Sequence, residues 1–295
     1  MKSFLWLVIV VAGGWILKRI FYRFLDKTAG GRVDALADKL FEAAYSSMQK
    51  YLKTHSHSEV VKKAKNNDPE AQFNLGCMYC FGEGVSQDYS EALKWFKKAA
   101  GNGLTEAQFN LGLMYDNGKG VNQDKSEAAK WYRKAAEQGY SYAQNNLAVM
   151  YQYGNGVEQD SAEAFKWYRE AARHGLPEAQ SNLGAMYYNG EGVEQNYYEA
   201  SKWFKKAAEQ GNAPAQYNLG FLYYRGDGVR QDYNEAVRLF RESADQGHPP
   251  AQYNLGLMYS NGDGVQQDKS EAVKWLKKAA NQGLTEAQDI LKQIQ

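Results

Sequence analysis

The stretch AQFNLG, from Ala71 to Gly76, decides the fold because it returns along the chain at a constant spacing. An identical copy begins at Ala107, and the variants AQNNLA, AQSNLG, AQYNLG and AQYNLG begin at Ala143, Ala179, Ala215 and Ala251. A seventh start, AQDILKQIQ, follows at Ala287. Every step is 36 residues, without an insertion. A fixed period of this length is typical of a repeat architecture.

Each repeat is predicted to form two helices. In the first copy, Ala71, Leu75 and Met78 share one face at helical spacing, with Tyr79 beside them. This helix is expected to end at the first glycine of a GxGV motif, because glycine readily adopts the left-handed conformation that ends helices. The glycines at this position are Gly82, Gly118, Gly154, Gly190, Gly226 and Gly262.

The second helix is predicted to begin at an Asp or Asn that precedes a Glu by three residues in all six copies. This spacing resembles a capping box, in which the glutamate side chain reaches back to the cap residue. The pairs are Asp88/Glu91, Asp124/Glu127, Asp160/Glu163, Asn196/Glu199, Asp232/Glu235 and Asp268/Glu271. In the first copy this helix buries Ala92, Trp95, Phe96 and Ala99 and ends near Gly103.

The combined motif AxxNLGxMY…GxGVxxDxxEAxxWFxKAA resembles the Sel1-like repeat, a relative of the tetratricopeptide repeat. The resemblance implies an all-α fold, a right-handed α-solenoid of 36-residue helix-turn-helix repeats whose first helices line a concave surface. Independently of the resemblance, a single repeat of this kind cannot bury its apolar face alone, so neighbouring repeats must stack.

The sequence predicts three regions. Residues 1–27 form a membrane anchor or signal-like segment, and residues 28–58 form a capping helix and linker. Within the second region, Val33, Leu36, Leu40, Ala44, Met48 and Leu52 lie along one side of an amphipathic helix from Val33 to Lys53. Residues 59–295 form the solenoid: a half-repeat 59–70, repeats 71–106, 107–142, 143–178, 179–214, 215–250 and 251–286, and a capping helix 287–295.

The N-terminal region contains an uncharged apolar run, FLWLVIVVAGGWIL, from Phe4 to Leu17. This run is shorter than the roughly 20 residues that a spanning helix needs. If Lys18 and Arg19 extend their side chains to the interface, the helix continues to Tyr22. We therefore expect residues 4–22 to form a single-pass N-terminal anchor in a bacterial inner membrane. The alternative is a cleaved secretory signal with its cleavage site at Ala12–Gly14.

The side of the membrane is read from the flanking charges. Lys18, Arg19, Arg23 and Lys27 follow the apolar run, whereas only Lys2 precedes it. The positive-inside rule favours the repeats in the cytoplasm. The resemblance favours the periplasm, because bacterial Sel1-like proteins are frequently exported. The charge pattern is given the greater weight here.

The composition argues against several classes of function. A net charge of +1 gives no general attraction to nucleic acid, and the four histidines are scattered. We expect no cofactor and no metal. Cys77 and Cys80 have the C-x-x-C spacing, but zinc would require two further ligands, and Cys77 occupies a position that Leu113 fills one repeat later. Both cysteines are interpreted as ordinary repeat positions.

Positions three, seven and ten of the first helix vary among the copies, whereas the opposite face barely varies. Because recurring residues hold the stack, the varying residues are free to recognise a partner. Aromatic anchors in a groove are typical of binding hot spots. The predicted partner-binding residues are Tyr188, Tyr217, Phe221, Tyr224, Tyr253, Leu257, Phe73 and Phe109. Alternatively, the seventh-position residues pack between neighbouring first helices and the tyrosines cover them.

An asparagine recurs at position four of each first helix, although asparagine has poor helix propensity. The residues are Asn74, Asn110, Asn146, Asn182, Asn218 and Asn254. The favoured interpretation is a hydrogen bond to the loop backbone of an adjacent repeat. The alternative is a ladder that grips the backbone of an extended peptide.

The preferred hypothesis is a non-enzymatic, membrane-anchored scaffold or adaptor that binds a protein or peptide on its concave face. The resemblance implies roles in signalling, envelope assembly or secretion, or neutralisation of a secreted effector. One alternative is a hydrolase acting on cell-wall or β-lactam substrates, although no nucleophile–base pair stands outside the repeat pattern. Another is a purely architectural spacer.

Overall fold

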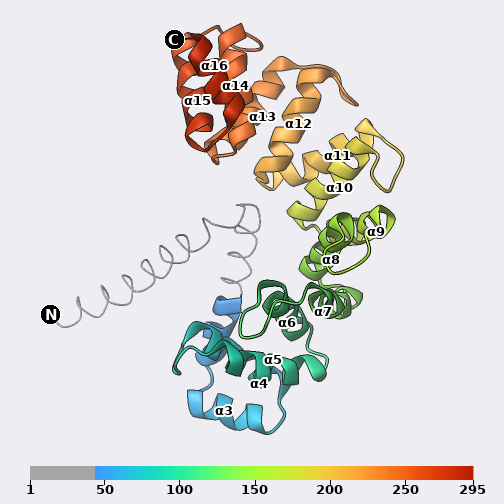
Figure 1. Ribbon diagram of the computed structural model, residues 1–295, viewed down its shortest axis with the longest axis vertical. Coiled ribbons are helices and arrows are strands. Elements are labelled where there is room, and N and C mark those ends of the chain that lie inside the picture. Colours follow the sequence, from blue (N-terminus) through green and yellow to red (C-terminus); the bar gives the residue numbers. More distant parts are fainter. Residues whose placement is uncertain (1–43, 295) are drawn as a thin grey trace, which may run out of the picture. The chain divides into compact units, whose positions relative to one another are not determined.

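The computed structural model describes residues 44–294 and is all-helical over that part of the chain (Figure 1). Residues 44–52 are helical, and α3 spans His57–Lys65. The first helices of the six repeats are α4 (Pro69–Phe81), α6 (Thr105–Asn117), α8 (Ser141–Tyr153), α10 (Pro177–Asn189), α12 (Ala213–Arg225) and α14 (Pro249–Asn261). The second helices are α5 (Tyr89–Gly101), α7 (Lys125–Glu137), α9 (Ser161–Arg173), α11 (Tyr197–Glu209), α13 (Tyr233–Asp245) and α15 (Lys269–Asn281). The last described helix is α16 (Thr285–Ile294). The prediction of an all-α helix-turn-helix array is confirmed.

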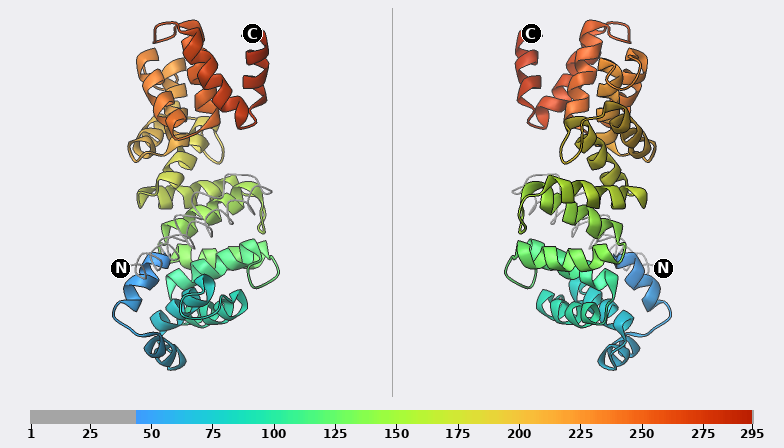
Figure 2. Two further views of the ribbon diagram at one scale, coloured as in Figure 1. Left: turned by 90° about the vertical axis from the view of Figure 1, so that its left-hand side faces the viewer. Right: turned by 90° about the vertical axis from the view of Figure 1, so that its right-hand side faces the viewer.

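The chain divides into two compact units, residues 1–95 and 96–295. In the described part of the first unit, α3 packs against α4, Met48 is fully buried, and Tyr45 makes an edge-on contact with Phe81. In the second unit, each helix from α6 to α16 packs against the next (Figure 2). The helices of this unit therefore stack in chain order, as expected for repeats that cannot bury their apolar faces alone.

The first helices end where the sequence predicted. Gly118, for example, has φ +67° and donates its backbone N–H to the carbonyl oxygen of Met114, so it closes α6 in the left-handed conformation. The equivalent glycines after α4, α8, α10, α12 and α14 have the same conformation and make the same type of bond. The first glycine of GxGV is therefore a helix C-cap.

The second helices begin at the predicted cap residues, but the recurring glutamate has a different partner from the one expected. The carboxylate of Asp124 accepts the backbone N–H of Glu127, as an N-cap should. The Glu127 side chain pairs with Lys130, three residues further along α7, at 2.9 Å. The same pairing recurs in α5, α9, α11, α13 and α15. The glutamates thus neutralise a basic residue on the exposed surface instead of completing a capping box.

Close packing within a repeat depends on a glycine in the middle of the first helix. A Cβ atom added to Gly184 would lie 2.7 Å from the Phe204 ring of the second helix. The third repeat has Ala148 at this position, in the same buried cluster as Tyr168. The recurring glycine allows the two helices of a repeat to approach closely enough to bury the aromatic ring between them.

Neighbouring repeats are joined by two further recurring contacts. A Cβ atom added to Gly192, the second glycine of its GxGV motif, would lie 2.1 Å from the carbonyl oxygen of Ser161 in the preceding repeat. In addition, Gln180 donates its amide to the carbonyl oxygen of Ala172 at 3.2 Å and accepts from Gln210 of its own repeat's second helix at 2.8 Å. These contacts account for two recurring features of the sequence, the second glycine and the glutamine that follows the first alanine.

The predicted membrane anchor, residues 4–22, and the first part of the predicted capping helix, residues 33–43, lie outside the described residues. From residue 44 to residue 294, no helix is both long enough and apolar enough to cross a bilayer.

Candidate interaction surface

Position three of the first helix is buried in four of the six repeats. Phe73 and Phe109 are 6% and 1% exposed. The Phe109 ring contacts the rings of Tyr132 and Tyr140 at centroid distances of 5.6 and 5.0 Å. Both phenylalanines are therefore core residues, which corrects the expectation that they lie on a binding surface. At the same position Tyr217 and Tyr253 are only half-buried.

Positions seven and ten remain partly open along the second unit. The side chains of both positions are half-buried in α6, α8, α10, α12 and α14, and they include the predicted residues Tyr188, Phe221, Tyr224 and Leu257. We call these ten residues the first-helix face. Its members are Leu113, Asp116, Val149, Gln152, Ala185, Tyr188, Phe221, Tyr224, Leu257 and Ser260. Tyr217 and Tyr253 adjoin it.

Tyr217 connects the core to the first-helix face. Its ring lies 5.7 Å from Phe240 and 6.4 Å from Phe221, measured between centroids. Its hydroxyl accepts the side-chain amide of Asn254 in the next repeat at 3.4 Å. Burial raises the pKa of the Tyr217 hydroxyl above its ordinary value. This residue positions Phe221 and leaves only part of its own ring for a partner.

Tyr188 and Tyr224 each form a pair with the first residue of the following second helix. Tyr188 lies 5.2 Å from Tyr197, and Tyr224 lies 5.2 Å from Tyr233, with ring planes tilted by 51° and 54°. Sequence reasoning missed Tyr197 and Tyr233. The available signal was a tyrosine at position ten together with a tyrosine at the start of the second helix, a combination that the first repeat, with Cys80 and Tyr89, and the second and sixth, with lysine at the helix start, do not have.

Charged groups flank these tyrosines. Arg225 Nε lies 2.8 Å from Asp227 Oδ2, and the Arg225 guanidinium lies 5.7 Å from the centre of the Phe221 ring. Asp263, one repeat later, accepts the side-chain amide of Asn261 at 3.2 Å. Burial is the main cause that raises the pKa of Tyr188 and of Tyr224, and the charges of Asp227 and Asp263 raise the two values further. Over the fourth and fifth repeats the first-helix face is therefore rich in aromatic rings, with carboxylates at its edge.

Four of the recurring asparagines donate a hydrogen bond to a partner other than the predicted loop backbone. Asn74 and Asn110 donate to carbonyl oxygens of their own helices, those of Glu70 and Glu106, at 2.8 Å. Further along, Asn182 donates to Asn145 and Asn254 donates to Tyr217, each in the preceding repeat's first helix. Asn182 and Asn254 thus link adjacent first helices, whereas Asn74 and Asn110 bond within their own helix. The predicted partner, a loop backbone, was wrong for all four. The alternative, in which all six asparagines, Asn146 and Asn218 included, grip the backbone of an extended peptide, stays a prediction.

The two cysteines differ in exposure. Cys77 is 1% exposed, and burial raises the pKa of its thiol well above the ordinary value. Cys80 is half-buried. Within residues 44–294, no group of three or more His, Cys, Asp or Glu side chains is arranged to hold a metal ion. Cys77 behaves as a small apolar core residue.

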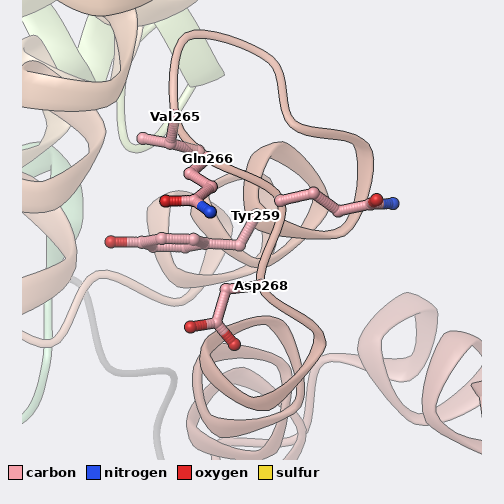
Figure 3. A pocket seen from close by; sticks show the side chains of 5 residues that line it. Tyr259, Val265, Gln266 and Asp268 are labelled. Atoms are coloured by element: carbon pink, nitrogen blue, oxygen red, sulfur yellow. The ribbon is translucent and has the colours of Figure 1, made fainter.

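A separate hollow of about 370 Å³ lies at the turn between α14 and α15 (Figure 3). It is lined by Tyr259, Val265, Gln266, Gln267 and Asp268. The Tyr259 backbone carbonyl accepts the N–H of Asp268 at 2.9 Å. Equivalents of Tyr259, Val265, Gln267 and Asp268 recur in all six repeats, so the hollow is a feature of the repeat turn and not of a dedicated site.

Comparison with known proteins agrees with this architecture. The model of the Sel1 repeat matches six consecutive segments, residues 69–104, 105–140, 141–176, 177–212, 213–248 and 249–284. These segments begin two residues before the AQxNLG motif, where the first helices begin. A search of curated proteins found no match.

Solved structures give the same result. A protective antigen of uropathogenic Escherichia coli is 41% identical, with a TM-score of 0.76 over 80% of this chain. The chain spans about half of that protein, 51% of its length. A Sel1 repeat protein from Oxalobacter formigenes is 32% identical, with a TM-score of 0.69 over 83% of this chain and 96% of that one. The Cut9–Hcn1 complex of the APC/C matches at 16% identity and a TM-score of 0.54, which shows the fold alone.

Proposed function

The chain belongs to the Sel1-repeat family, whose members are generally protein-interaction scaffolds, and from this premise we propose that it binds a protein or peptide on the first-helix face. The centre of the proposed surface is the aromatic group Tyr188, Phe221 and Tyr224, with Tyr217, Tyr253 and Leu257 beside it. Phe73 and Phe109 are left out because they are buried.

One observation carries this proposal. Large rings stay half-exposed at position ten of the fourth and fifth repeats and at position seven of the fifth, although the same positions elsewhere hold small, aliphatic or polar side chains. Partly buried aromatic side chains that are held rigidly supply much contact area at little cost in conformational entropy, as in binding hot spots. The Tyr217–Phe221 contact and the Tyr188–Tyr197 pair hold the rings in this way.

The test is selection of short random peptides displayed on phage, with the full chain immobilised, followed by fluorescence polarisation with the enriched peptide. Phe221→Ala is expected to weaken binding about 30-fold, the effect of losing about 2 kcal/mol from a hot spot. Tyr224→Ala should have a similar effect. Tyr198→Ala is the matched control: this tyrosine is 62% exposed and lies outside the first-helix face, so its loss should change the affinity less than twofold.

Thermal unfolding followed by circular dichroism will check that each variant is folded. If no peptide is enriched, or if the enriched peptide binds Phe221→Ala and Tyr224→Ala as tightly as the original chain, the first-helix face is not the binding surface.

The proposal assigns no catalytic role. Sel1-repeat proteins are generally non-enzymatic scaffolds, and the candidate surface is built from aromatic rings and not from a nucleophile with a base. Sustained turnover of cell-wall or β-lactam substrates by the purified chain, abolished by a single substitution, would contradict this part of the proposal.

We also propose that residues 4–22 anchor the chain in a bacterial inner membrane, with the repeats in the cytoplasm. The support is the apolar run followed by Lys18, Arg19, Arg23 and Lys27. Alkaline phosphatase fused after Gln295 is active only when exported, so a fusion in a Gram-negative host is expected to be inactive. A fluorescent reporter at the same position is the control. High phosphatase activity would place the repeats in the periplasm.

A further inference from the structure

The fourth and fifth repeats contain the same group of three side chains, one repeat apart. In the fourth, Tyr188 pairs with Tyr197, and Asp227 comes from the next GxGV turn. In the fifth, Tyr224 pairs with Tyr233, and Asp263 takes the equivalent place. We call each group a tyrosine–aspartate triad. The second, sixth and third repeats lack it, because they begin their second helices with Lys125, Lys269 and Ser161. The first repeat begins its second helix with Tyr89 but has Cys80 at position ten.

The packing of the turn brings each aspartate to its tyrosine pair. A Cβ atom added to Gly228, the residue after Asp227, would lie 2.4 Å from the carbonyl carbon of Tyr197. A Cβ atom on Gly264, after Asp263, would lie 2.5 Å from the carbonyl carbon of Tyr233. Both turns therefore lie directly against the backbone of the second tyrosine, and the two triads have the same construction.

The first triad already has a cationic partner within the protein. Arg225, the last residue of α12, forms an ion pair with Asp227 at 2.8 Å and places its guanidinium 5.7 Å from the Phe221 ring centre. Its positive charge also acts on Tyr188, where it lowers the pKa against the larger effect of burial. A guanidinium suits such a place because it can pair with a carboxylate while its flat face stacks on a ring.

The second triad has an amide where the first has this arginine. Asn261 is the last residue of α14, at the position of Arg225, and it donates to Asp263 at 3.2 Å. Among residues 44–294, Asp263 forms no ion pair with a lysine or arginine, in contrast to Asp227. The rings of Tyr224 and Tyr233 are half-buried and 39% exposed, respectively, so solvent reaches the triad. Two rings and an unneutralised carboxylate together favour a cation.

We propose that Tyr224, Tyr233 and Asp263 bind an arginine side chain of the partner, whose guanidinium pairs with Asp263 as Arg225 pairs with Asp227 in the first triad. The partner segment is therefore basic at the residue that meets the fifth repeat. This inference rests on the proposed function, because it names the chemistry of the segment bound at the first-helix face.

The experiment uses the peptide enriched on the full chain and a matched peptide in which each arginine is replaced by citrulline, which keeps the shape but not the charge. Citrulline is expected to weaken binding about tenfold or more, since a charge-assisted hydrogen bond to a carboxylate is lost. Asp263→Asn should weaken the arginine peptide by a similar factor. Asp227→Asn is the matched control, because Asp227 already forms an ion pair with Arg225. This variant should change the affinity for the arginine peptide less than about twofold.

A further variant leaves the whole second triad in place. Asn261→Arg introduces an arginine at the position of Arg225, on an exposed residue at the helix end. This internal guanidinium is expected to occupy the triad and to reduce the affinity for the arginine peptide about tenfold, with little effect on the citrulline peptide. Circular dichroism will confirm that the helical content is unchanged.

The outcomes separate this inference from the proposed function. If the peptide needs Phe221 but binds equally well with citrulline, with Asp263→Asn and with Asn261→Arg, the arginine inference is wrong and the binding surface stands. If enriched peptides contain no basic residue, the result is the same. If no peptide binds at all, both proposals fail together.

Discussion

The contact between the second glycine of the GxGV turn and the preceding repeat predicts how the stack is held together. Gly192 has φ +68°, and a Cβ atom there would lie 2.1 Å from the Ser161 carbonyl oxygen and 2.5 Å from its carbonyl carbon. Because these are backbone atoms at the start of α9, they cannot move aside as a flexible side chain would. The Gly192→Ala variant should therefore strain the junction between the third and fourth repeats.

Gly175→Ala is the matched control. Gly175 also has positive φ, +88°, but no atom lies within 4 Å of the place of its Cβ. Alanine in the left-handed region costs about 1–2 kcal/mol at either position, and the loss of chain entropy in the unfolded state is the same for both. Overpacking adds about 1–3 kcal/mol at Gly192 alone. The difference between the two variants is therefore expected to be about 1–3 kcal/mol, with Gly192→Ala the less stable.

Urea unfolding followed by circular dichroism gives the free energies of unfolding. Amide hydrogen exchange shows where the loss falls, since repeats unfold as units coupled to their neighbours. Gly192→Ala should increase exchange in α9, α10 and α11 more than in α14 and α15. If the two variants differ by less than about 0.5 kcal/mol, the turn does not pack on the preceding repeat as described.

Two further predictions concern titratable groups. At pH 8, a maleimide should label Cys80 rapidly and Cys77 only after unfolding, because Cys77 is buried and its thiol pKa is raised; rapid labelling of both thiols in the folded chain would contradict this. The pKa of Asp124 is lowered, mainly by the hydrogen bond from the backbone N–H of Glu127 and next by that from the hydroxyl of Ser126. The charge of Asp124 therefore stabilises the fold at neutral pH, and this effect is lost as the pH falls through the lowered pKa. Asp124→Asn keeps the cap without the charge, so the stability difference between the two chains should shrink in acid, and parallel pH profiles would refute the assignment.

The repeat, its two helices and their ends could all be predicted from sequence, because each depends on residues close together in the chain. The C-cap at Gly118 needs only glycine and the four residues before it. The role of Glu127 could not be predicted in the same way. Its carboxylate could reach the backbone of the cap residue or side chains further along α7, and in the structure it pairs with Lys130 and accepts the indole N–H of Trp131, each at 2.9 Å.

The candidate site was predictable only in part, because burial depends on the neighbouring repeat. Phe109 and Tyr217 occupy the same position in their helices and meet equivalent rings, Tyr132 and Tyr140 for Phe109 and Phe240 and His248 for Tyr217. Phe109 is nevertheless 1% exposed, whereas Tyr217 stays half-buried. Phe109 has one further ring beside it, that of Tyr142 in the next first helix at 6.4 Å, and the residue equivalent to Tyr142 beside Tyr217 is Pro250. A helical wheel describes a single helix and contains no information about the residues that pack against it from the next repeat.

The pair formed by position ten and the first residue of the second helix explains how a regular stack can carry local chemistry. In the second repeat the pair is Asp116 with Lys125, an ion pair, and in the fifth it is Tyr224 with Tyr233, two tilted rings. The backbone geometry is the same in both, since the caps and the glycines that set it recur. The second glycine of the next GxGV turn packs on the backbone of the pair's second residue, which every residue type supplies. A substitution at this pair therefore changes the side chains that the face presents while the backbone contact between the repeats stays the same. Selectivity for a partner is for this reason expected to reside in the residues of the pair and in the turn that follows, while stability resides in the recurring positions.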